Sequence, residues 1–154
     1  MYKILVVDDE SIEREGISFL IEKYKFPLEV AQATNGKTAL EYMRTHPIDI
    51  LLTDVKMPQM DGLELARHTF EKYPDVRILV FSAYGEFEFA KKAMAAQAVS
   101  YLLKPIEVDE FQRVMTQIIA QCDELSEKKK DEQQRDEEVR QQLLFRLVTG
   151  TGLG

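Results

Sequence analysis

Acidic, hydroxyl and basic side chains follow four of the short apolar runs in this sequence. Asp8 and Asp9 come after "KILVV", Asp54 after "DILLT", Ser82 after "VRILVF" and Lys104 after "VSYLL". If three carboxylates converge, each like-charged pair costs on the order of 3 to 4 kcal/mol, and a bound cation would offset that cost. Carboxylate oxygens suit Mg²⁺, and a metal with a lysine would neutralise a transferred phosphoryl group. We therefore expect phosphoryl transfer to Asp54 at a Mg²⁺ site.

Each of these residues also has a simpler explanation. Asp8, Asp9 or Ser11 could cap a helix. Ser82 could belong to a turn, and Lys104 could be a solvated charge. The occurrence of all these groups behind apolar runs favours a common site over separate structural roles.

The elements that would position the site follow from the hydrophobic pattern. Strands are predicted at 3–7, 28–33, 49–53, 76–81 and 99–103, and helices at 11–24, 36–44, 62–73, 86–95 and from 108 onward. Parallel neighbours need crossover connections, and the middle strands are too uniformly apolar for a sheet with one solvated face. We expect an α/β fold of (βα)5 type, a doubly wound parallel sheet with functional groups beyond the carboxyl ends of its strands.

Length, charge and composition limit the class of protein. The 154 residues can bury one substantial core, which we assign to residues 1–122. A net charge of -7 argues against DNA contact by this segment itself. Cys122 is the only cysteine, so no intrachain disulfide forms, and no run has the length of a membrane span. We expect a cytoplasmic protein without a membrane partner, in which His46 and His68 are surface residues.

Residues 123–154 differ in composition from the preceding domain. The stretch 123–142 contains eight acidic and five basic residues and no glycine or proline, which indicates a solvated helix or a disordered linker. The apolar run "LLFRLV" at 143–148 suggests the truncated start of a following region or a dimer contact. Between Leu125 and Val139, the heptad positions that a coiled coil would fill with apolar residues are occupied by Lys129, Glu132 and Asp136. This makes a continuous coiled coil doubtful.

Four ordered motifs resemble one known family. The segments "ILVVDDE", "LLTDVKMPQMDGLEL", "VFSAY" and "YLLKP" are similar to the receiver domain of bacterial two-component response regulators, over residues 2 to about 120. The resemblance implies a flavodoxin-like fold with strand order 2-1-3-4-5. It also implies a protein that is not an enzyme and that accepts a phosphoryl group from a sensor histidine kinase.

The resemblance assigns roles around the metal. It implies that Asp54 is the phosphoacceptor, that Asp9 binds Mg²⁺ directly and that Asp8 binds it largely through water. The backbone carbonyl of Lys56 would complete the metal ligands.

The resemblance also assigns a switch. Ser82 and Lys104 would contact the phosphoryl group, Tyr101 would swing inward, and Pro105 would follow a cis peptide bond. The face made by the fourth helix, fifth strand and fifth helix would then change its self-association. That face would include Phe87, Phe89 and Lys91, with one of the two phenylalanines serving at the surface.

The segment "SAYGEFEFAKKAM", and "LLFRLVTG" after the charged linker, are similar to those of regulators with an AraC-type helix-turn-helix output domain. The resemblance implies transcription regulation in the full-length protein and DNA binding only through the absent domain. Homodimers would form through the switch face, the linker helix or both.

Three other functions were compared with this interpretation. A haloacid-dehalogenase-type phosphohydrolase has its two acids two residues apart, whereas Asp8 and Asp9 are adjacent. A flavodoxin-type electron carrier needs a first loop that cradles phosphate, and "DDES" would repel one. A stand-alone phosphorelay receiver, acting by protein contact, is opposed only by the segment after residue 122.

Overall fold

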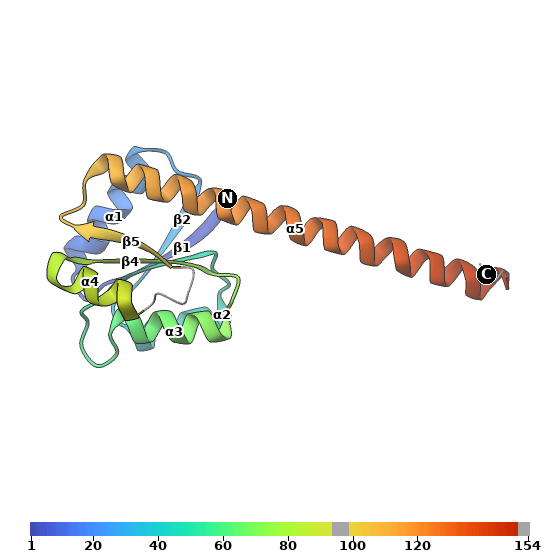
Figure 1. Ribbon diagram of the computed structural model, residues 1–154, viewed down its shortest axis with the longest axis horizontal. Coiled ribbons are helices and arrows are strands. Elements are labelled where there is room, and N and C mark those ends of the chain that lie inside the picture. The colour runs from blue at the N-terminus through green and yellow to red at the C-terminus, as the bar shows by residue number, and fades with distance from the viewer. Residues whose placement is uncertain (94–98, 151–154) are drawn as a thin grey trace. The chain divides into compact units, whose positions relative to one another are not determined.

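The computed structural model describes residues 1–93 and 99–150 and shows a parallel sheet with helices on both faces (Figure 1). The elements in chain order are β1 (Tyr2–Val7), α1 (Ser11–Lys23), β2 (Leu28–Ala33), α2 (Gly36–Thr45), β3 (Ile50–Asp54), α3 (Gly62–Lys72), β4 (Arg77–Ala83), α4 (Tyr84–Ala93), β5 (Val99–Lys104) and α5 (Val108–Thr149). Every paired strand runs parallel, and the sheet order is β2-β1-β3-β4-β5. The predicted α/β class and the flavodoxin-like strand order are therefore confirmed.

The predicted element boundaries differ from the observed ones by a few residues. β3 includes Asp54, which the prediction placed just beyond the strand. β4 continues to Ala83 because its pairing with β5 extends to Lys104. α4 starts at Tyr84 instead of Glu86, and its predicted last residues fall outside the described part of the chain. The Lys104–Pro105 peptide bond is cis, as the resemblance implied.

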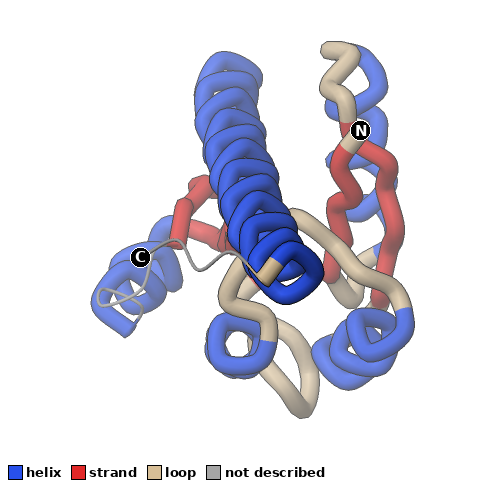
Figure 2. The backbone as a smooth tube through the Cα atoms, turned by 90° about the vertical axis from the view of Figure 1, so that its right-hand side faces the viewer, coloured by secondary structure: helices blue, strands red, loops and turns tan. Residues whose placement is uncertain are grey.

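Alternation of side chains along the strands supplies two apolar faces. On one face, Leu5, Val7 and Leu51 pack with Ala39 and Met43 of α2 and with α3, while Ile78 and Val80 pack with Ala66 of α3 and Ala90 of α4. The intervening strand residues are also buried, together with Ile17 and Ile21 of α1 and Phe111, Met115 and Ile118 of α5. Figures 1 and 2 show α1 and the first turns of α5 on the side of the sheet opposite α2 and α3. Burial on both faces explains the uniformly apolar middle strands.

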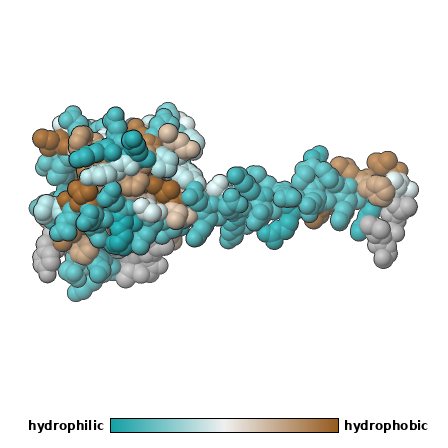
Figure 3. Space-filling model, turned by 90° about the horizontal axis from the view of Figure 1, so that it is seen from above, coloured by the Kyte–Doolittle hydropathy of each residue, from teal (hydrophilic) through white to brown (hydrophobic). Residues whose placement is uncertain are grey.

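The chain divides into two compact units, residues 1–119 and residues 120–154, and α5 passes from the first into the second. The sequence-based boundary lay at residue 122. The charged stretch is helical, so the first of the two alternatives for the linker is the one observed. Hydrophilic residues cover this stretch and apolar ones gather near its end (Figure 3). The exposed apolar residues there are Val139, Leu143, Leu144, Phe145, Leu147 and Val148.

Among the described residues, no helix combines the length and the hydropathy that crossing a bilayer requires.

Candidate functional site

Asp54 is the last residue of β3, a strand that lies between β1 and β4. The backbone N–H of Val55 donates a 2.8 Å hydrogen bond to Oδ1 of Asp54. The Thr53 hydroxyl donates to the Asp54 carbonyl oxygen over 2.9 Å. Only 6% of Asp54 is exposed. A fully buried strand therefore holds this carboxylate in a defined orientation at the edge of the sheet.

The start of α3 packs directly against the end of β3. Asp61 caps the helix by accepting a 2.8 Å hydrogen bond from the N–H of Glu64, and Gly62 N–H donates to the Val55 carbonyl over 2.7 Å. A Cβ atom on Gly62 would overlap the carbonyl oxygen of Asp54. The absence of a side chain at Gly62 therefore allows the close approach that fixes the loop behind Asp54.

Asp8 follows β1 and is completely buried. Its Oδ1 atom accepts a 2.8 Å hydrogen bond from Glu10 N–H, while its Oδ2 atom has no hydrogen-bond partner. The N-cap residue of α1 is Glu10, without a side-chain cap, and Ser11 is the first helical residue. The helix-cap explanation for Asp8 is thus wrong, because Glu10 occupies the N-cap position and no side chain caps the helix.

The structure adds Glu13, which the sequence analysis did not single out. Carboxylate oxygens of Asp8, Glu13 and Asp54 lie within 4.8 Å of one another. Glu13 belongs to the first turn of α1, where the helix dipole stabilises acidic side chains. The available signal was its place just after β1, since the first turn of that helix lies beyond the carboxyl edge of the sheet.

Lys104, at the end of β5, is the cation among these carboxylates. Its Nζ atom lies 2.7 Å from Glu13 Oε2, 3.2 Å from Asp54 Oδ1 and 4.0 Å from Asp8 Oδ2. It also stands 4.5 Å from the centre of the Phe81 ring. Three carboxylates thus share one ammonium group, and the site keeps an excess of negative charge when all of them are ionised.

The pKa values of the acids reflect this crowding. Burial, together with the neighbouring Glu13, raises the pKa of Asp8 from its ordinary 3.8 to about 8. Burial also raises the pKa of Asp54, although Lys104 opposes the shift. Contacts with Asp8 and Lys104 lower the pKa of Glu13.

Lys104 has the opposite balance of effects. Burial acts to lower its pKa, but the hydrogen bond to Glu13 and the charge of Asp54 outweigh burial and raise it. Lys104 therefore stays an ammonium group at neutral pH, ready to pair with anionic oxygens.

A cavity of about 540 Å³ opens beside Asp54. Asp9, Lys56 and Lys104 line it together with Asp54, and both Asp9 and Lys56 are exposed. The structure therefore brings Asp9 and Lys56 to the cavity beside the phosphoacceptor candidate.

Ser82 lies in β4, the neighbour of β3, and Tyr101 lies one strand further, in β5. Ser82 follows Phe81, the register partner of Asp54, and its buried hydroxyl has no hydrogen-bond partner. The Tyr101 hydroxyl donates to the Ala90 carbonyl over 3.4 Å. The switch roles of Ser82 and Tyr101 stay predictions.

The Tyr101 ring meets Phe87 of α4 edge to face, with ring centres 6.0 Å apart. The Phe89 side chain, also predicted for this surface, lies outside what the structure describes. His46 and His68 are exposed, as predicted.

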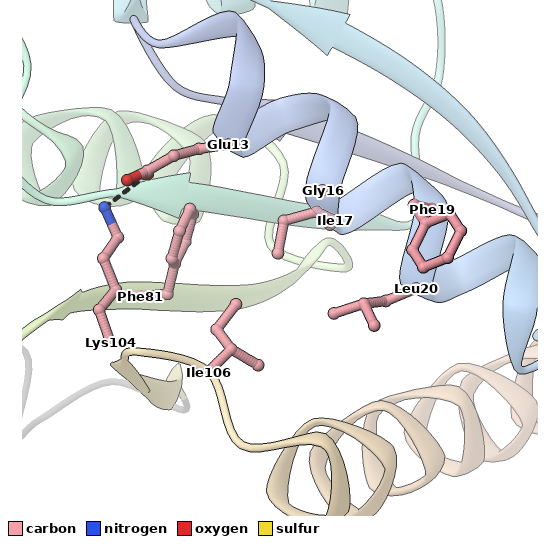
Figure 4. Close-up of a pocket in the computed structure, with 8 residues that line it drawn as sticks. All are labelled: Glu13, Gly16, Ile17, Phe19, Leu20, Phe81, Lys104 and Ile106. Atoms are coloured by element: carbon pink, nitrogen blue, oxygen red, sulfur yellow. Dashed lines mark hydrogen bonds and ion pairs between the residues drawn. The ribbon is translucent and has the colours of Figure 1, made fainter.

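Glu13 and Lys104 also line a second cavity, of about 390 Å³ (Figure 4). Its wall is otherwise formed by α1, Phe81 and Ile106. In Figure 4 the Glu13 side chain reaches from α1 toward Lys104, with the Phe81 ring beside them. Lys104 therefore lines both this apolar cavity and the cavity beside Asp54.

Comparisons with known proteins identify the family of this chain. Residues 4–116 match the family model of the response regulator receiver domain. The transcriptional regulatory protein YesN of Bacillus subtilis is 41% identical over 122 residues, which are 79% of this chain and 33% of YesN. The response regulator GacA of Pseudomonas aeruginosa is 33% identical over 120 residues, which are 78% of this chain and 56% of GacA. The chain thus spans about a third to a half of these relatives.

Solved structures show the same fold. A two-component transcriptional regulator AraC from Clostridium phytofermentans superimposes with a TM-score of 0.72 at 35% identity, over 79% of this chain and 95% of that one. The REC domain of AraT, a response regulator from Geobacillus stearothermophilus, gives a TM-score of 0.72 at 37% identity, over 83% and 98%. Because the family model covers residues 4–116, most of the chain, the chain belongs to the response regulator receiver domain family.

Proposed function

We propose that this chain receives a phosphoryl group on Asp54 from a sensor histidine kinase and thereby changes its self-association. The observation that carries the proposal is the anchoring of the Asp54 carboxylate. Val55 N–H and Lys104 both contact Oδ1, so these contacts leave Oδ2 for nucleophilic attack. That oxygen would attack phosphorus in line while the bond to the donor's imidazole nitrogen breaks and its electron pair leaves with the imidazole.

The donor set fits a Mg²⁺ ion. Asp8 contributes a buried carboxylate oxygen without a hydrogen-bond partner, and Asp54 and Asp9 add further carboxylates at the same edge. We propose that Asp8, Asp9, Asp54 and the backbone carbonyl of Lys56 hold the ion, since hard oxygen ligands suit it. When bound, Mg²⁺ supplies positive charge for the phosphoryl oxygens.

Lys104 and Ser82 would bind the phosphorylated product. The Lys104 ammonium group already contacts Asp54. It could therefore donate a hydrogen bond to a phosphoryl oxygen while β5 stays in place. Leaving a buried hydroxyl unpaired costs about 1–3 kcal/mol, and Ser82 would recover that cost by donating to the phosphoryl group. The unphosphorylated state therefore has an unmet hydrogen bond that phosphorylation satisfies.

Tyr101 would transmit the change to the face formed by α4, β5 and α5. Its hydroxyl makes a long 3.4 Å hydrogen bond to Ala90, and its ring packs on Phe87. Movement of Ser82 and the start of α4, which follows β4 directly, toward the phosphoryl group would open space for the ring to turn inward. We propose that this face, the linker part of α5, or both, form the homodimer.

In the full-length protein we propose that the receiver domain controls transcription. YesN and the Clostridium phytofermentans protein are described as transcriptional regulators. Contact with DNA would belong to a region outside this chain, because the chain itself is acidic. Within this division of roles, residues 123–154 would link the two parts.

The proposal is tested by intact-mass measurement. Wild-type protein treated with acetyl phosphate and Mg²⁺ is expected to gain one phosphoryl group, and Asp54→Asn is expected to gain none. Glu15→Asn, an exposed substitution on α1, is the control and should be modified like the wild type. An unchanged mass for folded wild type, or a stoichiometric adduct on Asp54→Asn, contradicts the proposal.

A further inference from the structure

Glu13 is the carboxylate that lies nearest to Lys104. The 2.7 Å separation from Glu13 Oε2 is shorter than the 3.2 Å to Asp54 Oδ1. Glu13 comes from α1 and Asp54 from β3, so two different elements compete for the same ammonium group. The nearer partner is thus the residue that carries no phosphoryl group in the proposed function.

The surroundings of Lys104 limit where its ammonium group can lie. Its ammonium group rests 4.5 Å from the centre of the Phe81 ring, and 22% of its side chain is exposed. Phe81 is buried and fixed by the sheet. The lysine side chain is thereby confined to the region between Glu13 and Asp54, where a gain in one contact weakens the other.

We propose that Glu13 is a positioning residue that holds Lys104 while Asp54 is unphosphorylated and gives it up when a phosphoryl group arrives. The inference rests on the proposed function of Asp54. A phosphoryl group adds up to about two negative charges and strong acceptor oxygens, which attract the lysine and repel the Glu13 carboxylate. Glu13 therefore opposes the phosphorylated state and favours return to the resting one.

The partial exposure of Glu13 distinguishes this role from a merely structural one. Glu13 is about a third exposed, with 31% of its side chain accessible. Partly exposed ion pairs contribute little to stability, so Glu13→Gln should fold normally. Its effect should fall instead on the affinity of the site for a phosphoryl group.

The test uses the whole chain and beryllofluoride as the phosphoryl mimic, with Mg²⁺ saturating for each variant. Glu13→Gln is expected to bind beryllofluoride about fivefold more tightly than the wild type, because a competing and repelling charge is removed. Glu15→Gln makes the same change of net charge on the exposed side of α1 and should bind like the wild type. Melting temperatures of both variants should stay near that of the wild type.

The outcomes separate the two proposals. If wild type and Glu13→Gln bind the mimic equally, or Glu13→Gln binds it more weakly, the role of Glu13 is refuted while the function of Asp54 stands. If Glu15→Gln tightens binding as much as Glu13→Gln does, net charge explains the effect and the role is refuted. If none of the proteins binds the mimic or accepts a phosphoryl group, the proposed function fails, and the inference fails with it.

Discussion

The Nζ atom of Lys104 lies 3.2 Å from the Oδ1 atom of Asp54, so the end of β5 supplies positive charge to the end of β3. Lys104 is 50 residues from Asp54 in the chain, and the pairing depends on the parallel register of β3, β4 and β5. The contact joins a nucleophile candidate to the group that would neutralise its product. Substitutions around this pair should each change a different property of the protein.

Lys104→Ala should destabilise the metal-free protein because the carboxylates of Glu13 and Asp54 would then lack their cation. We expect a loss of about 1–3 kcal/mol in the free energy of unfolding at neutral pH, measured with denaturant in EDTA. Mg²⁺ should restore part of the loss. Lys92→Ala, an exposed site on α4, is the control and should change stability little.

Asp8 should make the stability of the metal-free protein depend on pH. Its folded pKa of about 8 lies above the ordinary 3.8, so the folded state holds the proton more tightly than the unfolded chain. The stabilising contribution is complete below about pH 4 and is lost as pH rises toward 8, with a slope of at most about 1.4 kcal/mol per pH unit.

Thermal unfolding in EDTA across this pH range tests the contribution of Asp8. Asp8→Asn should flatten the decline, whereas the exposed Asp9→Asn should leave it unchanged. If the stability of Asp8→Asn falls with rising pH as steeply as that of the wild type, the assignment of this pH dependence to Asp8 is contradicted.

Gly62→Ala should damage both stability and phosphorylation. The added methyl group would overlap the Asp54 carbonyl oxygen, a backbone atom that cannot move without shifting β3. We expect a loss of about 1–3 kcal/mol and slower modification of Asp54 by acetyl phosphate. Gly16→Ala on α1 has open space around it and should be neutral or stabilising by up to about 1 kcal/mol. Equal behaviour of the two variants would show that the approach of α3 to β3 is not tight.

Beryllofluoride with Mg²⁺ should strengthen self-association, as measured by sedimentation. Tyr101→Ala should reduce this response, because the ring that contacts Phe87 would no longer convey the change to the α4–β5–α5 face. Unfolding measured in parallel distinguishes a lost response from a lost fold. An association state that is the same with and without the mimic would remove the switch from this chain.

The apolar end of α5 should contribute to association whether or not the mimic is bound. Val139, Leu143 and Leu147 recur every four residues and are exposed, so burying them between two chains would be favourable. Leu143→Lys should lower association in sedimentation, while Gln133→Lys, in the charged part of the helix, should not. No difference between these two variants would exclude the apolar end as a dimer contact.

The sequence alone determined the fold class and most of the candidate site. Alternating strand and helix patterns predict crossover connections, and crossover connections require a parallel sheet, so Asp8, Asp54 and Lys104 had to emerge at one edge. The ordered motifs then gave the family, which the comparisons confirm. These features follow from local patterns that each segment carries in its own residues.

Only the tertiary structure decided the partners within the site. Glu13 looks like an ordinary acid in the first turn of a helix, and Lys104 lies 91 residues away. Their contact depends on how α1 packs across the sheet and on the Phe81 ring beneath the lysine. The pKa of Asp8 likewise depends on complete burial beside other carboxylates. Packing between distant segments sets such distances, and no local pattern in the chain records them.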